Sequence, residues 1–205
     1  MRLGVFGGSF DPVHYGHLLL AECCREQRAL DQVWFVPTAV PPHKKGLAMT
    51  PGPTRVEMIE LAIAGHPAFS VNRYEVDRGG INFTVDTLAH VQEISPQSEI
   101  FFLLGTDMLY DLPHWRHAER ICELATLVVV RRAGVAPVAL DFLMGITTAE
   151  RIEAIRRHQV EMPEIGISST ELRQRVNTGR SIRYQTPAEV EAYIHSRGLY
   201  DKRLT

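Results

Sequence analysis

Short, continuously apolar runs alternate with helix-compatible stretches through most of the chain. The apolar runs cover residues 3–6, 33–36, 100–104 and 126–130. The helix-compatible stretches cover residues 14–30, 55–64, 84–94 and 115–124, and residues 69–76 are strand-like. Strands that are apolar on both faces are buried on both faces, and parallel strands need crossover connections of helical length. The pattern predicts an open, doubly wound α/β fold, in which helices cover both faces of a mostly parallel sheet.

The last third of the chain changes character after Arg132. Residues 133–146 have weak periodicity, 147–158 resemble a helix begun by a threonine cap, and 159–167 are the expected last strand. Hydroxyl-rich starts at residues 168–171 and 186–189 predict two C-terminal helices, ending near Val176 and Ser196. We expect one domain over residues 1–205, with 168–205 as a helical subregion.

Charge and cysteine content exclude several classes of protein. The chain has 22 basic and 24 acidic residues, a net charge of -2, which argues against a nucleic-acid partner. Its three cysteines, Cys23, Cys24 and Cys122, form neither a disulfide framework nor a spaced metal motif, so we expect a cytoplasmic protein. No apolar run approaches the roughly 18 residues that a membrane span needs, so we expect no membrane contact.

The first strand is followed by a glycine loop and a helix with two histidines. Residues 7–17 read GGSFDPVHYGH. Glycine allows close approach of the backbone to a ligand, and amides at a helix start can bind phosphate. The loop is neither a Walker loop nor a GxGxxG fingerprint. His14 and His17 share a helix face if the helix begins by His14, so both could point at one phosphate. Taken separately, a turn and two ordinary histidines explain the same residues.

Residues 7–17 resemble the GGxFDPxHxGH motif of the nucleotidyltransferases, whose HxGH histidines bind triphosphate and stabilise the transition state. Four further segments, in order, resemble one family, the bacterial nicotinate-nucleotide adenylyltransferases. They are PPHK at 41–44, NFTVDT at 82–87, GTD at 105–107 followed by Trp115, and ISSTELR at 167–173. The resemblance covers nearly the whole chain, although residues 133–160 contain no motif of the family.

The resemblance implies transfer of the adenylyl group of ATP to nicotinate mononucleotide, giving nicotinate adenine dinucleotide and pyrophosphate, in a Rossmann-like nucleotidyltransferase fold. Such a reaction needs positioning and electrostatic stabilisation rather than a covalent enzyme intermediate. The implied catalytic residues are His14, His17 and Lys44. The implied ATP-binding residues are Gly7, Gly8, Ser9, Phe10, His17, Gly105, Asp107, Ser168, Ser169 and Arg173. Mg²⁺ is expected to arrive with ATP, held by phosphates and water rather than by a protein cage.

Within the catalytic and ATP-binding sets, each residue type suits an anionic or ribose ligand. A bound phosphate would raise the pKa of both histidines. Lys44 would add a mobile charge, and Arg173 a bidentate fork one turn after the Ser168 and Ser169 hydroxyls. By resemblance, Asp107 binds the ATP ribose. The alternative explanations are a solvated lysine, an ordinary helix cap and a turn-forming aspartate.

By the same resemblance, nicotinate mononucleotide is bound by Thr84, Val85, Trp115 and Arg116. Trp115 would stack on the nicotinate ring, while backbone amides near Val85 and Arg116 would face the carboxylate. Amide donors favour a carboxylate over a carboxamide, whose NH₂ would face a donor. The alternative for Trp115 is a partly buried packing residue.

Several titratable residues have no expected role at the site. Asp11 is expected to form a turn and Asp86 to help cap a helix. The expected solvated histidines are His66, His90, His117, His158 and His195.

Three rival functions remain open from sequence. A related HxGH transferase could act on nicotinamide mononucleotide, phosphopantetheine or an alcohol phosphate. A nucleotide sensor on the same fold would have lost part of the histidine or serine–arginine set. A metal-dependent hydrolase could use His14, His17 and His43, but no acidic ligand lies at a recognisable spacing.

Overall fold

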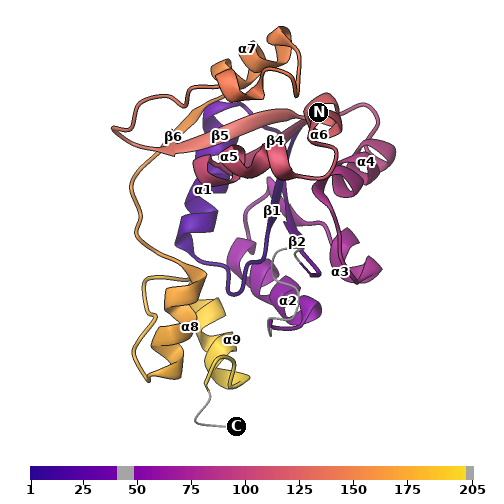
Figure 1. Cartoon of the computed structure of the whole chain (residues 1–205). Helices are drawn as coiled ribbons and strands as arrows, with labels where there is room; N and C mark the ends of the chain where they lie inside the picture. Colours follow the sequence, from indigo (N-terminus) through magenta and orange to yellow (C-terminus); the bar gives the residue numbers. More distant parts are fainter. Residues whose placement is uncertain (41–48, 202–205) are drawn as a thin grey trace.

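A computed structural model describes residues 1–40 and 49–201, which fold around a six-stranded parallel sheet (Figure 1). The strand order is β3-β2-β1-β4-β5-β6, and every neighbouring pair is parallel. The strands are β1 (Arg2–Gly8), β2 (Gln32–Pro37), β3 (Phe69–Val71), β4 (Glu99–Gly105), β5 (Thr126–Arg132) and β6 (Val160–Met162). The predicted doubly wound α/β fold is therefore confirmed.

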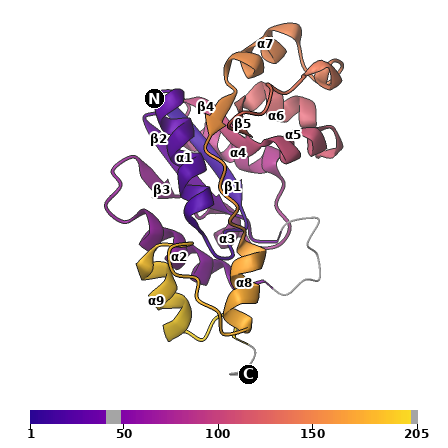
Figure 2. The same ribbon diagram turned by 90° about the vertical axis from the view of Figure 1, so that its left-hand side faces the viewer.

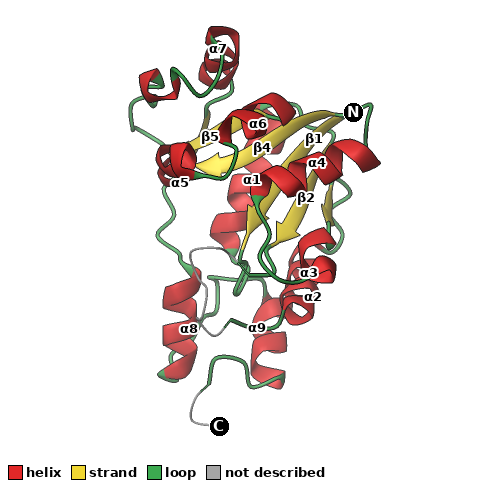
Figure 3. Cartoon of the chain, turned by 45° about the vertical axis from the view of Figure 1, so that its right-hand side comes forward, coloured by secondary structure: helices red, strands yellow, loops and turns green. Residues whose placement is uncertain are grey.

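Helices cover both faces of the sheet (Figure 3). One face is covered by α1 (Tyr15–Gln27) and α2 (Gly52–Ile63). Helices α8 (Ser169–Asn177) and α9 (Ala188–Ser196) lie below the sheet in Figure 1 and add side chains to the same core. The other face carries α4 (Thr84–Ile94), α5 (Thr106–Asp111), α6 (Ala118–Leu124) and α7 (Ala149–Arg157). Two 3-10 turns, η2 (Leu112–His114) and η3 (Asp141–Leu143), and the short α3 (Tyr74–Arg78) complete the described elements. Within the described ranges, no helix is long and apolar enough to cross a membrane.

Each central strand supplies apolar side chains to both layers. In β4, Phe101 and Leu103 join the core beneath α1 and α2, whereas Phe102 and Leu104 join the core beneath α4 and α6. All four side chains are buried. This two-sided burial is the physical reason that the strand reads as a continuous apolar run.

The strand order reverses between β1 and β4. The chain moves outward from β1 through β2 to β3, then returns to place β4 on the other side of β1. Parallel pairing aligns the two strands, with Val5 opposite Phe102, so their carboxyl ends lie at the same edge. Open α/β sheets bind ligands at such a switch point. The glycine loop follows β1 at this edge, and α5 follows β4 directly.

Three predicted element boundaries are wrong, two of them for local reasons. The strand expected at 69–76 ends at Val71, because the Asn72 side chain accepts a hydrogen bond from Tyr74 N (3.0 Å) where α3 starts. The helix expected at 115–124 begins only at Ala118, because His117 adopts a left-handed conformation (φ 52°). The last strand covers only Val160–Met162 of the expected 159–167.

Candidate functional site

The loop after β1 is shaped by Phe10, whose side chain is fully buried. A Cβ atom at Gly8 would lie 2.9 Å from the Phe10 ring, closer than side-chain packing allows. Phe10 itself has a positive φ of 46°, and its ring packs edge-on against Phe6 (5.3 Å between centroids). Gly8 is therefore required by packing within the loop itself, in addition to any approach of a ligand.

His14 and His17 come together at the start of α1. The helix begins at Tyr15, so His14 is its N-cap rather than a residue of its first turn. The two rings stack with centroids 3.7 Å apart and planes at 26°. A Cβ at Gly16 would lie 3.0 Å from the His14 ring, so the glycine makes room for the stack. The predicted juxtaposition is confirmed, although it depends on a cap rather than on a shared helix face.

A reciprocal capping box fixes the tautomer of both rings. Gly16 N donates to Nδ1 of His14 (3.1 Å), and His14 N donates to Nδ1 of His17 (3.3 Å). A ring nitrogen that accepts a hydrogen bond carries no hydrogen, so the neutral form of each ring holds its hydrogen on Nε2. Both rings can thus donate a hydrogen bond from Nε2 while they are neutral.

Burial keeps both histidines neutral in the free protein. Desolvation lowers the pKa of His14 to about 4, opposed by a hydrogen bond to its own backbone. Desolvation also lowers the pKa of His17 well below its ordinary value, and the neighbouring His14 lowers it further. An anion bound at the pair would act in the opposite direction.

Helix α8 starts beside the same loop, although it lies more than 150 residues further along the chain (Figure 2). Ser169 Oγ donates to the carbonyl of Pro12 (2.8 Å), and Arg173 Nη1 donates to the carbonyl of Asp11 (2.7 Å). Ser168 is the N-cap, accepting from Glu171 N (3.2 Å). The structure therefore brings the predicted serine–arginine set to the histidine loop, where part of its donor capacity holds the loop backbone.

The carboxyl end of β4 places a carboxylate at the switch point. Gly105 ends the strand and is the N-cap of α5, and a Cβ there would meet no atom within 4 Å. Asp107 follows in the first turn of α5 and is exposed. The side chain is thus available to a ligand at the sheet edge where the sequence predicted it.

The predicted nicotinate residues meet where α4 begins. Thr84 and Val85 open α4, and the first amides of a helix lack intrahelical acceptors. The guanidinium of Arg116 lies over the ring of Phe83 (4.7 Å to the centroid), the N-cap of this helix. Trp115 is half-buried, edge-on to Phe102 (6.1 Å).

Trp115 also has a polar partner. Its Nε1 donates to Asp111 Oδ2 (3.0 Å), and its ring packs partly against the core beneath α4. The packing alternative is therefore satisfied on one side of the indole, while the half-exposed remainder can meet a ligand.

Some predicted residues lie outside the described residues, and two aspartates can be compared with their expected roles. Lys44, within the expected PPHK segment, and His43 are outside the described residues. Asp11 lies in a turn, as expected, and it is also buried and accepts from the hydroxyl of Tyr200 (2.6 Å). Asp86 lies in the first turn of α4, where the helix dipole stabilises a carboxylate.

Three of the histidines expected to be solvated are half-buried. His66 stacks on Phe69 (3.8 Å), and His90 stacks on Tyr74 (3.9 Å). His158 Nδ1 lies 2.7 Å from the carbonyl of Ala154. The remaining two, His117 and His195, are exposed as expected.

Arg55 and Tyr200, which donate hydrogen bonds to Ser9 and Asp11 of the loop, were not predicted from the sequence. Arg55 is 1% exposed, and Tyr200 is the partner of Asp11. The signal for Arg55 was available, because it shares a helical stripe with the apolar Ile59 and Ile63. A lone cation on an apolar stripe indicates a buried, hydrogen-bonded charge.

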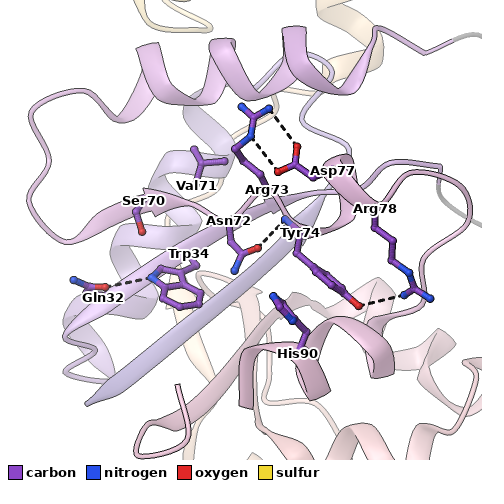
Figure 4. A pocket seen from close by; sticks show the side chains of 10 residues that line it. All are labelled: Gln32, Trp34, Ser70, Val71, Asn72, Arg73, Tyr74, Asp77, Arg78 and His90. Carbon is purple, nitrogen blue, oxygen red and sulfur yellow. Dashed lines mark hydrogen bonds and ion pairs between the residues drawn. The ribbon is translucent and has the colours of Figure 1, made fainter. Parts of the chain in front are cut away.

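A cavity of about 740 Å³ lies elsewhere, beside β2, β3 and α3 (Figure 4). Trp34 and the Tyr74–His90 stack form its aromatic wall, and Arg73 and Arg78 lie at its rim. Asp77 pairs with Arg73 (3.3 Å), and Asp86 lies 3.6 Å from Arg78. Both guanidinium groups already have carboxylate partners, so this cavity offers little uncompensated positive charge.

The described residues hold no cluster of three or more His, Cys, Asp and Glu side chains suited to a metal ion. That Mg²⁺ arrives with ATP, held by phosphate oxygens and water, stays a prediction. The third ligand expected for a metal-dependent hydrolase, His43, is outside the described residues.

Comparison with known proteins gives a consistent family. Residues 5–175 match the cytidylyltransferase-like family. A probable nicotinate-nucleotide adenylyltransferase of Thermus thermophilus is 46% identical over 204 residues, covering 98% of this chain and 100% of its own. A relative of the same name from Geobacillus kaustophilus is 40% identical over 202 residues, covering 98% and 87%.

Solved structures share the fold at lower identity. The nicotinic acid mononucleotide adenylyltransferase of Plasmodium falciparum, complexed with NaAD, has a TM-score of 0.77 at 19% identity, covering 100% of this chain and 99% of its own. A putative nicotinate-nucleotide adenylyltransferase of Vibrio parahaemolyticus has a TM-score of 0.70 at 21% identity, covering 98% and 97%. Because full-length relatives reach 46% identity, the chain belongs to the nicotinate-nucleotide adenylyltransferase family, within the cytidylyltransferase-like proteins.

Proposed function

We propose that the protein transfers the adenylyl group of ATP to nicotinate mononucleotide, releasing pyrophosphate and forming nicotinate adenine dinucleotide, a step of NAD biosynthesis in the cytoplasm. The observation that carries the proposal is the stacked pair His14–His17 at the switch point, with both Nδ1 atoms occupied by backbone amides. The pair presents two Nε2 donors at a helix N-terminus, which suits phosphate oxygens.

Chemistry at this site is attack by a phosphate oxygen of the mononucleotide on the α-phosphorus of ATP. The bond from the α-phosphorus to the bridging oxygen breaks, and the electron pair leaves with pyrophosphate. Donors that meet the growing charge on the leaving group stabilise the transition state more than the ground state. His14 and His17 have this role, Lys44 adds charge, and the substrate phosphates raise the pKa of both imidazoles.

The triphosphate is held between the loop and α8. Gly7, Gly8, Ser9 and Phe10 supply backbone groups, and Ser168, Ser169 and Arg173 supply hydroxyl and guanidinium donors. Asp107 accepts from the ribose, and Gly105 leaves room beside it. Mg²⁺ bound to ATP would neutralise part of the charge of the phosphates. The residues of the chain itself bind and orient the reactants.

The nicotinate end is read by α4 and the segment around Trp115. The indole stacks on the pyridine ring, Thr84 and Val85 contribute amides at the start of α4, and Arg116 lies against Phe83 beside them. A carboxylate accepts from these amides, whereas a carboxamide turns its NH₂ toward at least one donor. The acid is therefore the preferred substrate.

One assay tests this function. Purified protein is incubated with ATP and Mg²⁺ together with either nicotinate or nicotinamide mononucleotide, and pyrophosphate release is measured. We expect release with both and a higher kcat/KM for the acid. Binding of ATP without pyrophosphate release would identify a nucleotide sensor, and a preference for the amide would overturn the proposed reading of the carboxylate.

A further inference from the structure

Arg55 is a fully buried cation in the first half of α2. Its guanidinium stays charged at any physiological pH, and charges of this kind are seldom buried unless they are paired. Burial lowers the pKa of Arg55, and the nearby Asp11, Tyr200 and Glu75 oppose that shift. An apolar residue would fill the same stripe as Ile59 without this desolvation cost. The buried guanidinium therefore needs a specific set of hydrogen-bond acceptors.

Three separate segments receive the hydrogen bonds of this guanidinium. Nη1 donates to the carbonyl of Ser9 (2.7 Å), in the loop after β1. Nη2 donates to the carbonyl of Thr38 (2.6 Å), just after β2. Nε donates to the carbonyl of Thr50 (2.9 Å), just before α2. Thr38 N and Oγ1 also donate to the carbonyl of Gly8 (2.9 and 3.2 Å), so Thr38 is tied to the end of β1 directly as well as to the loop through Arg55.

The same loop is held from its other side by Asp11. The buried carboxylate accepts from Thr50 N (3.2 Å) and from the hydroxyl of Tyr200 (2.6 Å). Residues Ser9 and Asp11 are thus fixed by one polar cluster, which we call the Arg55 cluster: Arg55, Asp11, Thr50 and Tyr200. Within this cluster, Asp11 precedes His14 by only three residues.

We propose that Arg55 is a positioning residue for adenylyl transfer. It holds the Ser9 carbonyl, and with Asp11 it sets the path of the chain into the His14–His17 pair. Its side chain is 1% exposed, so it acts through the loop rather than on the substrate. The proposal rests on the proposed function for its catalytic consequence, whereas its structural part concerns the loop alone.

The test compares Arg55→Lys with a matched control, Arg2→Lys. Lysine keeps the charge but cannot reach three carbonyl oxygens with a planar fork. Arg2 also donates two hydrogen bonds to one backbone carbonyl, that of Arg28 (3.3 and 3.2 Å), but at the opposite end of β1. Steady-state kinetics are measured at a temperature where circular dichroism shows both variants folded. Amide hydrogen exchange is followed for peptides covering residues 7–18.

We expect Arg55→Lys to lower kcat by about 10- to 100-fold, the scale of a misplaced catalytic group. The KM for nicotinate mononucleotide should change much less, and exchange in residues 7–18 should accelerate. Arg2→Lys should keep kcat within about twofold and leave exchange there unchanged. A folded Arg55→Lys with wild-type kcat, or with unchanged exchange in this loop, would overturn the proposal.

A milder variant keeps the test decisive if Arg55→Lys does not fold. Tyr200→Phe removes only the hydroxyl that meets Asp11, and it should lower kcat several-fold and speed exchange in residues 7–18. Wild-type values of both would contradict the positioning role. If the wild type releases no pyrophosphate, the proposed function fails, and the exchange measurement still decides whether the Arg55 cluster holds the loop.

Discussion

The stability of the protein should fall between pH 7 and pH 5 because of His14. Burial lowers the pKa of this imidazole to about 4 in the folded state, against 6.5 for an exposed histidine. As the pH falls, the unfolded chain therefore takes up a proton before the folded protein does. The contribution of the buried, neutral His14 to the free energy of unfolding is fully present above pH 6.5 and is lost progressively toward pH 4.

The magnitude follows from the interval between these two pKa values. An interval of about 2.5, at about 1.4 kcal/mol for each pH unit, gives a total of roughly 3 kcal/mol. For a single site, about 2 kcal/mol of this is already lost on going from pH 7 to pH 5. His17 contributes in the same direction, because its pKa is lowered as well.

Urea denaturation of the wild type and of His14→Asn at both pH values isolates this effect. Asparagine is a good N-cap and can still accept from Gly16 N, but it does not titrate. We expect the wild type to lose about 2 kcal/mol more than the variant between pH 7 and pH 5. Equal losses in the two proteins would refute the assignment of a buried, neutral His14.

Three substitutions test the site residues separately. His17→Ala should lower kcat by about 10²–10³ while leaving the circular dichroism spectrum unchanged, since it removes a donor to developing charge; activity within a few-fold of wild type would remove His17 from catalysis. Arg173→Lys should raise the KM for ATP more than that for the mononucleotide, because lysine lacks the fork; the opposite order would argue against triphosphate binding. Trp115→Ala should weaken calorimetric binding of nicotinate mononucleotide by about 1–3 kcal/mol, with ATP little affected; equal losses would return Trp115 to a packing role.

The architecture could be predicted because its determinants are local. Buried parallel strands read as continuous apolar runs, as β4 and β5 do, and Ser168 marks the start of α8 as an N-cap. The histidine loop could be found because residues 7–17 resemble a known motif, whereas its capping box, which joins residues only two or three positions apart, was not predicted.

What escaped prediction depends on contacts between distant segments. The hydrogen bonds from Arg173 to Asp11 and from Tyr200 to Asp11 cross 162 and 189 positions of the chain. No periodicity can report such pairs. The short helices α3 and α5 have five and six residues, too few for a helical pattern to emerge from the sequence.

The most direct test of the account is a crystal structure with a non-hydrolysable ATP analogue and nicotinate mononucleotide bound together. We predict phosphate oxygens within hydrogen-bonding distance of Nε2 of His14 and His17, at the carboxyl ends of β1 and β4. Nucleotide bound instead in the cavity lined by Trp34, Tyr74 and His90, with the histidine pair free of phosphate, would contradict it.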